Sequence, residues 1–263
     1  MRCVFVTAIA MLMRCPAGWT QRPSDADATA LIERSRAKAL DYARSLPDFV
    51  CTETIRRYTP FESQLGLVWR HADTLTVRLS YFQQKEEHKL VAIDDKPSDR
   101  KYQELAGVTG MGEFGGTLHA IFHPASETSF RWQGWKTVRG RKAAVYTYAV
   151  DAAHSRFKLS NGVAGHTHQA FVGFRGDLEA DSATGEVLQF TYLPDQIPKE
   201  LDLFYTRTTV DYDFADVGGR DYLLPARSQT EMRGRLVAAR SVTEFRDYHK
   251  FAADSTIDFG PGK

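Results

Sequence analysis

The stretch 169–251 constrains the fold most, because its apolar residues alternate with polar ones. A period of two is typical of strands that bury one face. The letters DSATG between the first two runs supply turn residues and a glycine, so we predict a hairpin there. The apolar side chains of these two runs are Val172, Phe174 and Leu178, and then Leu188, Phe190 and Tyr192.

The alternation continues toward the C-terminus. TTVDYDFADV places Val210, Tyr212 and Phe214 on one face, and the letters VGGR then turn the chain. The remainder of the stretch is predicted to return through further strands. A sheet of this length with one apolar face requires a cover, and we interpret the preceding residues as that cover.

An N-terminal helix is predicted over residues 24–45. Ser24 and Asp27 have the spacing of a capping box, and Leu46-Pro47-Asp48 ends the helix. Buried apolar area contributes about 25 cal/mol per Å², which favours docking of this helix on the apolar face of the sheet. The residues that share its apolar stripe are Leu31, Ile32, Ser35, Ala39, Tyr42, Ala43 and Leu46.

Two further hairpins and an insertion are predicted between these regions. Leu75, Val77, Leu79 and Tyr81 alternate in a strand before QQKEEH, which we interpret as a solvated turn that includes Glu86 and His88. Residues 96–135 form an insertion, with a glycine-rich loop and a short helix that Pro124 ends. A second hairpin turns at Gly140, and residues 161–165 form another turn. The fold class is therefore α+β.

Composition limits the location and the classes of partner. Residues 1–17 are typical of a secretory signal, and their apolar run covers only about half of the ~20 residues that span a membrane. The formal charge is +1, and it becomes −1 when Arg2 and Arg14 leave with the signal. This balance argues against nucleic acid as a partner. No linker divides residues 24–263, so we expect a single domain. After removal of the signal we expect that it does not span a membrane.

At this point the chain resembles the outer-membrane lipoprotein carrier group, which includes periplasmic lipid-binding lipoproteins and an anti-sigma-factor regulator. The residues that carry the resemblance are GDLEADSATGEVLQFTYLP and VDYDFADVGGRDYLLPARSQTEMR. The resemblance implies an unclosed, strongly curved antiparallel barrel whose concave side, covered by helices, holds acyl chains. It covers most of the mature chain as an architecture and little of it as sequence, and no catalytic signature accompanies it.

Residues with the chemistry of an active site are few. His119 and His123 stand one helical turn apart and are weak candidates for metal ligands, with His88, Glu113 or the pair His166 and His168 as further ligands. Asp94-Asp95 and the pair Asp211 and Asp213 are interpreted as a turn and as the polar face of a strand. Cys51 is interpreted as a small buried hydrophobe, and we expect no cofactor.

The sequence therefore predicts a periplasmic or secreted protein, without catalysis, that binds a lipid or another apolar ligand on the concave side. A cell-envelope interaction module with a filled core, which binds a protein through the glycine-rich loop, is the alternative, and a metal-dependent hydrolase is the third. The candidate lining residues are Leu75, Val77, Leu79, Tyr81, Leu188, Phe190, Tyr192, Tyr212 and Phe214.

Overall fold

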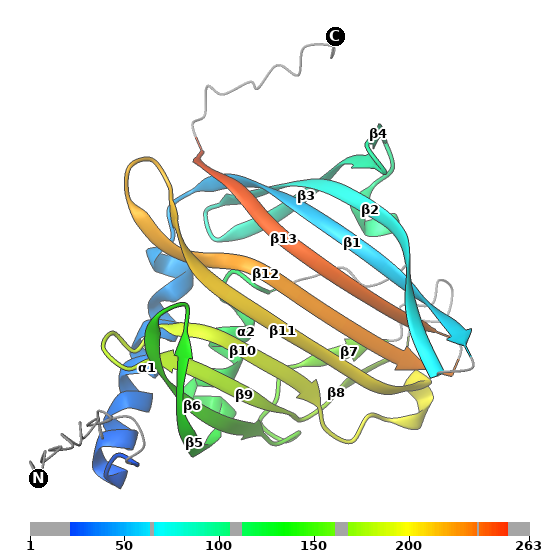
Figure 1. Ribbon diagram of the computed structural model, residues 1–263. Helices are drawn as coiled ribbons and strands as arrows, with labels where there is room; N and C mark the ends of the chain where they lie inside the picture. The colour runs from blue at the N-terminus through cyan, green and yellow to red at the C-terminus, as the bar shows by residue number, and fades with distance from the viewer. Residues whose placement is uncertain (1–21, 64–65, 106–111, 161–167, 236, 252–263) are drawn as a thin grey trace, which may run out of the picture.

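The protein is built on one antiparallel sheet of eleven strands, which curves around the N-terminal helix (Figure 1). The computed structural model describes residues 22–63, 66–105, 112–160, 168–235 and 237–251. The strand order is β4-β3-β2-β1-β13-β12-β11-β10-β9-β6-β5, and the end strands β4 and β5 do not pair with each other. The prediction of an α+β fold with an unclosed sheet is thus confirmed.

The N-terminal part of the sheet and the insertion contain two helices, two short 3-10 helices and the first strands. Their bounds are α1 (Asp25–Ser45), β1 (Phe49–Ser63), β2 (Gly66–Phe82), β3 (Lys85–Ile93), β4 (Lys96–Pro97), η1 (Tyr102–Glu104), α2 (Gly116–Phe122) and η2 (Pro124–Ser126).

The rest of the described chain is almost entirely strand. Its elements are β5 (Ser129–Val138), β6 (Arg141–Val150), β7 (Lys158–Ser160), β8 (Gln169–Phe171), β9 (Phe174–Asp181), β10 (Val187–Pro194), η3 (Lys199–Leu201), β11 (Leu203–Asp216), β12 (Asp221–Gly234) and β13 (Ala238–Lys250). The pairing of β13 with β1 joins the last strand to the first.

Helix α1 forms where the sequence predicts it and docks on the concave face. The hydroxyl of Ser24 caps the helix by accepting the N–H of Asp27 at 3.1 Å. Its buried residues are those of the predicted stripe, Leu31, Ile32, Ser35, Ala39 and Tyr42. Since α1 lies against β6, β12 and β2 in turn, it crosses the strands and does not extend the sheet.

Tyrosine hydroxyls fasten α1 to the sheet. Tyr146 of β6 donates to the carbonyl of Ala28, and Tyr81 of β2 donates to the carbonyl of Ala43, each at 2.9 Å. Tyr42 of the helix donates in the opposite direction, to the carbonyl of Leu223 in β12. Each bond satisfies a polar hydroxyl that docking would otherwise bury without a partner, so these tyrosines belong to the packed core.

Two predicted elements differ from the structure. The turn in QQKEEH contains only Gln83 and Gln84, which adopt positive φ, and β3 begins at Lys85, so Glu86 and His88 are strand residues and not a solvated tip. The run around Val172 and Phe174 is not one strand. It is divided between β8, which pairs with β7 in a small second sheet, and β9, because Gly173 packs directly on the backbone of Val150.

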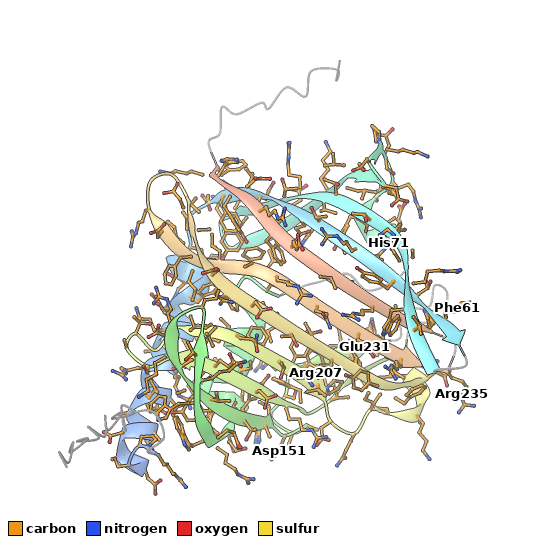
Figure 2. The ribbon with its side chains drawn as sticks, viewed as in Figure 1. Phe61, His71, Asp151, Arg207, Glu231 and Arg235 are labelled. Atoms are coloured by element: carbon orange, nitrogen blue, oxygen red, sulfur yellow. The ribbon has the colours of Figure 1, made fainter. Side chains whose placement is uncertain are left out.

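The convex face of the central strands is polar. Arg56 of β1 and Glu244 of β13 form an ion pair of 2.7 Å, and Arg207 and Glu231 are register partners on β11 and β12 (Figure 2). This face meets water, as the alternation of the strands requires. In the part of the chain that the structure describes, no helix is long and apolar enough to cross a membrane. The predicted signal and the turn at 161–165 lie outside the described residues.

A pair of glycine substitutions tests the packing of the sheet. At Gly176 in β9 an added Cβ would overlap the carbonyl oxygen of Thr191 and approach the hydroxyl of Tyr148, so Gly176→Ala should lower the free energy of unfolding by about 2 kcal/mol or more. At Gly116 in α2 no described atom lies within 4 Å of such a Cβ, so Gly116→Ala should raise the free energy of unfolding by about 0.5–1 kcal/mol. Urea unfolding measures both, and equal effects would contradict the described register.

Candidate functional site

The predicted lining residues lie on the concave side, but they are packed core. Seven are at most 2% exposed, and Tyr192 and Phe214 are half-buried. They divide among neighbouring clusters, in which the insertion residues Tyr102, Leu105 and Phe114 cover β2 while α1 and α2 cover β10 and β11. The concave side is therefore filled by side chains over these positions.

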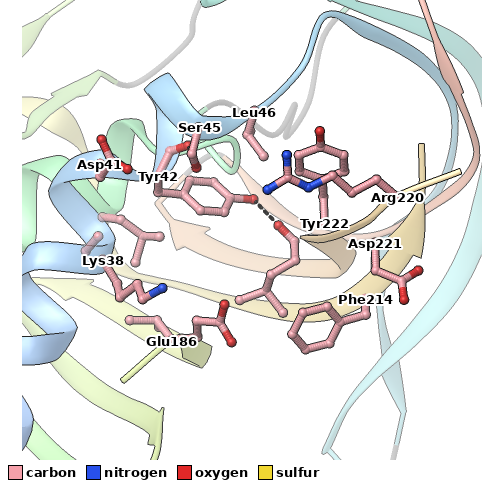
Figure 3. A pocket seen from close by; sticks show the side chains of 14 residues that line it. Lys38, Asp41, Tyr42, Ser45, Leu46, Glu186, Phe214, Arg220, Asp221 and Tyr222 are labelled. Carbon is pink, nitrogen blue, oxygen red and sulfur yellow. Dashed lines mark hydrogen bonds between the residues drawn. The ribbon is translucent and has the colours of Figure 1, made fainter. Parts of the chain in front are cut away.

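A pocket of about 220 Å³ remains between α1, the start of β10 and the hairpin of β11 and β12 (Figure 3). We call it the α1 pocket. Tyr42 crosses it, with its hydroxyl bound to the carbonyl of Leu223 at 2.9 Å. Its walls carry apolar side chains, and its rim carries charges of both signs. The lining residues are Lys38, Ala39, Asp41, Tyr42, Ser45, Leu46, Leu118, Glu186, Val187, Phe214, Arg220, Asp221, Tyr222 and Leu223.

Two turns hold the walls of the α1 pocket. The turn between β9 and β10 ends at Gly185, whose φ of 80° leaves its α-carbon facing Arg34 of α1, and Arg34 donates to the carbonyl of Ser182 at 3.2 Å. The turn between β11 and β12 uses Gly218 and Gly219 at positive φ, which places Arg220 at the rim. Pockets for drug-sized ligands measure about 300–1,000 Å³, so this one fits a smaller apolar group.

A second set of residues, which the sequence analysis did not bring together, lies under the insertion. We call Glu53, Glu86, His88 and Glu113 the carboxylate cluster. Glu53 of β1 is 4% exposed and Glu113 is 5% exposed. Nε2 of His88 lies 3.5 Å from Oε1 of Glu53, while Oε2 of Glu53 is buried and has no hydrogen-bond partner among the described residues. Buried carboxylates with so few partners are unusual and strongly perturbed.

The electrostatics of the carboxylate cluster follow from this burial. Burial, followed by Glu53 and Glu86, raises the pKa of Glu113 to about 7. Burial also raises the pKa of Glu86, with an opposing effect of His88. For His88, burial lowers the pKa, but Glu53, Glu86 and Glu113 together outweigh it, and its pKa is raised. The cluster therefore retains protons that free side chains would have lost near neutral pH.

One signal in the sequence could have located part of this cluster. Glu53 occupies the inward position between Cys51 and Ile55, where the alternation of β1 calls for an apolar residue. Glu86 and His88 also occupy alternate positions of a strand, β3. In the sequence, however, the charged run around them is typical of a solvated loop. Glu113 could not be assigned, since nothing local indicates that its glycine-rich segment packs on the sheet.

The rings of His119 and His123 lie next to each other at the end of α2. His119 and His123 lie on one side of α2, with ring centroids 4.9 Å apart. Nδ1 of His123 accepts the N–H of Ala125 and so caps η2, and burial followed by His123 lowers the pKa of His119. Within the described ranges, no group of three or more His, Cys, Asp or Glu side chains could hold a metal ion. His166 lies outside those ranges.

The other candidates have structural partners. Cys51 is 3% exposed, and burial followed by Glu53 raises the pKa of its thiol, which opposes formation of a nucleophilic thiolate. Asp211 accepts from the amide of Gln189, and Asp213 forms an ion pair with Arg139. These aspartates therefore line the polar face of β11, as the sequence analysis interprets them.

The carboxylate cluster predicts how stability depends on pH. The folded pKa of Glu113 lies above its unfolded value, so the native state holds an extra proton between pH ~4.5 and ~7, and the free energy of unfolding should fall by up to about 3 kcal/mol as the pH rises through this window. His88 contributes with the same sign, because its stabilisation is complete below its unfolded pKa of 6.5 and is lost as the pH rises through its raised folded pKa.

Urea unfolding at a series of pH values measures this dependence. Glu113→Gln should flatten the curve between pH ~5 and ~7, since an amide does not titrate. Glu87→Gln is the matched control, because Glu87 is an exposed carboxylate on the same strand as Glu86. A Glu113→Gln curve as steep as that of the wild type would contradict the assignment.

Comparisons with known proteins find similar structures only at low levels. A LolA superfamily protein from Nitrosomonas europaea matches at 9% identity and a TM-score of 0.35, over 84% of this chain and 92% of the other. A DUF1329 family protein from Desulfovibrio piger matches at 8% identity and a TM-score of 0.37, over 88% of this chain and 94% of the other. The lipoprotein LppX from Mycobacterium tuberculosis matches at 10% identity and a TM-score of 0.30, over 85% of this chain and 97% of the other.

No protein-family model matches the chain. No curated protein matches it either. The resemblance to the lipoprotein carrier group is thus confirmed as a similarity between structures, while similarity at these TM-scores assigns neither family nor function. The fold class rests on the strand order itself.

Proposed function

We propose that this protein is an exported binding protein that holds an apolar ligand, without catalysis, in the α1 pocket. The observation that carries the proposal is an apolar pocket beneath a helix that lies on the concave side of an unclosed sheet. Leu46, Leu118, Val187, Phe214 and Leu223 offer aliphatic and aromatic surface, as sites for apolar ligands do. The rim charges belong to both signs and favour no single class of headgroup.

The attachment of α1 allows the helix to move, so the protein could hold a ligand larger than the α1 pocket. No strand pairs with α1, so its contacts with the sheet are side-chain packing and a few hydroxyl bonds, such as that of Tyr42 with Leu223. Moving the helix would break none of the ladder bonds of the sheet. An acyl chain that took the place of the helix stripe would bury similar apolar area, so part of the loss would be offset.

A second candidate is favoured by the filled concave side. Side chains occupy the positions predicted to line a ligand cavity, which fits an envelope protein that binds another protein rather than a lipid. The glycine-rich loop proposed for that contact lies partly outside the described residues, and its described end is core, since Phe114 is 2% exposed. Deletion of 110–116 would therefore damage packing and would not separate the two candidates.

Dye binding tests the proposal. Protein refolded from denaturant to remove lipid should increase the fluorescence of the neutral apolar dye N-phenyl-1-naphthylamine. Phe214→Asp should weaken this binding by about tenfold or more, equivalent to ~1.4 kcal/mol, because it places a charge among the apolar walls. Phe214 is half-buried, so circular dichroism must first establish that the variant is folded.

The matched control uses the same strand and the same substitution. Phe204 of β11 is 67% exposed and does not line the α1 pocket, so Phe204→Asp should leave dye binding unchanged. Equal weakening by both variants, or no binding by the delipidated wild type, would refute the proposal. Absence of dye binding together with capture of an envelope protein would favour the second candidate.

A further inference from the structure

The turn at 112–115 connects the carboxylate cluster to the α1 pocket. On one side, Glu86 of β3 accepts the backbone N–H groups of Gly112 and Phe114. On the other, Tyr212 of β11 donates its hydroxyl to the carbonyl of Glu113. The ring of Phe114 enters the aromatic core, 5.3 Å from that of Phe49. We call residues 112–115 the anchoring turn, because these contacts hold the start of α2 on the sheet.

The anchoring turn also supports two walls of the α1 pocket. Gly115 has a φ of 112°, and a Cβ there would lie 3.0 Å from Cβ of Ala43 and 3.1 Å from Cδ1 of Tyr42, so the turn packs directly on α1. Tyr42 and Leu118, the third residue of α2, both line the pocket. A displacement of the turn would therefore release a wall residue from each helix.

The side chain of Glu113 lies in acidic surroundings. Glu53 interacts with it from β1 and has a buried carboxylate oxygen without a hydrogen-bond partner in the described part of the chain, and Ser228 of β12 donates a hydrogen bond to Glu113. The nearest cation that is paired within the cluster is His88, and Arg57 of β1 is already bound to Asp73 at 2.5 Å. The titratable groups that interact with Glu113 are Glu53 on β1, Glu86 and His88 on β3, Tyr102 on η1, Tyr192 on β10 and Tyr212 on β11. Around these, Cys51 interacts with Glu53, Arg57 with Tyr102, and Tyr42 of α1 with Tyr212.

We propose that the carboxylate cluster is a proton-operated latch, which seats the anchoring turn when Glu113 is protonated and releases it, opening the α1 pocket, when Glu113 ionises. The geometry supplies the reason. With the proton, Glu113 is a neutral group that the site can bury. Without the proton, the Glu113 carboxylate lies among the carboxyl groups of Glu53 and Glu86, and Glu53 and Glu113 are both buried. Among the described residues of the cluster, His88 is the one basic group, and it lies against Glu53. The least costly relief is exposure of Glu113 by movement of the turn.

The direction of the effect follows from linkage. The seated state has the higher pKa for Glu113, about 7, and the released state has the ordinary value near 4.5. The equilibrium constant for release should therefore rise by about tenfold per pH unit between pH ~5 and ~7 and level off above that. Protonated His88 favours the seated state, so its loss of charge acts in the same direction.

Hydrogen exchange of the full chain tests the latch without any ligand. Protection factors for the α2 amides of His119 and Thr117, which bond back to Gly115 and Gly112, should fall by about tenfold per pH unit from pH ~5 to ~7, after the intrinsic pH dependence of exchange is divided out. Glu113→Gln should keep these amides protected throughout. Glu87→Gln, on the exposed face of β3, should follow the wild type.

A second variant keeps the test decisive if Glu113→Gln fails to fold. Of the acidic neighbours of Glu113, Glu53 raises its pKa most, so Glu53→Gln should lower the pKa of Glu113 in the seated state. The loss of α2 protection should then be smaller than in the wild type and should level off at a lower pH. Protection that does not vary with pH in the wild type, or a Glu113→Gln profile with the wild-type slope, would overturn the latch. A Glu53→Gln profile that loses as much protection as the wild type would do the same.

The regulatory role rests on the proposed function and has a separate measurement. Binding of N-phenyl-1-naphthylamine, which does not carry the carboxylate of a fatty acid, should strengthen over the same pH window in the wild type. In Glu113→Gln its pH dependence should be much weaker, with only the contribution of His88 left. Dye binding without pH-dependent exchange would leave the proposed function standing and refute the latch. Exchange that depends on pH, without dye binding at any pH, would support the latch and refute the proposed function.

Discussion

The packing of α1 across the concave face holds the core of this protein together. The concave face of a curved sheet of eleven strands requires a cover, and the helix covers part of it with Leu31, Ile32, Ala39 and Tyr42. Hydroxyl bonds from Tyr81 and Tyr146 to helix carbonyls remove the penalty of burying those tyrosines. The same arrangement limits function, because the residues that hold the helix also fill the space in which a larger ligand would lie.

The insertion carries the features that distinguish this chain from a plain covered sheet. It buries Phe114 among the aromatic residues of β1 and β2 and places Glu113 against Glu53 and Glu86. A fold that maximised stability would use apolar side chains at these inward positions, since replacing buried charged groups by well-packed apolar ones is often neutral or favourable. Natural chains usually depart from such local rules where function requires it. The carboxylate cluster and the α1 pocket therefore form one region, joined by the anchoring turn.

Much of the fold could be predicted from local pattern. The alternation around Leu75, Leu188 and Tyr212 identified strands, and Ser24 with the stripe at Leu31 identified the helix, because these signals depend only on neighbours along the chain. The candidate site was predicted less well. Its predicted lining residues face inward, but whether that face is hollow depends on volumes contributed by distant segments. The predictions of a single domain, of export and of the absence of catalysis remain predictions.

The fold class, the span of α1, most of the hairpins and most of the inward apolar side chains follow from local pattern, since the period of a strand or helix is a local property of the backbone. The filled concave side, the pocket of about 220 Å³ beneath α1 and the meeting of Glu53, Glu86, His88 and Glu113 follow from tertiary packing alone. These facts depend on pairings across long sequence separations, such as β1 with β13, and no periodic pattern records which segments will pack together.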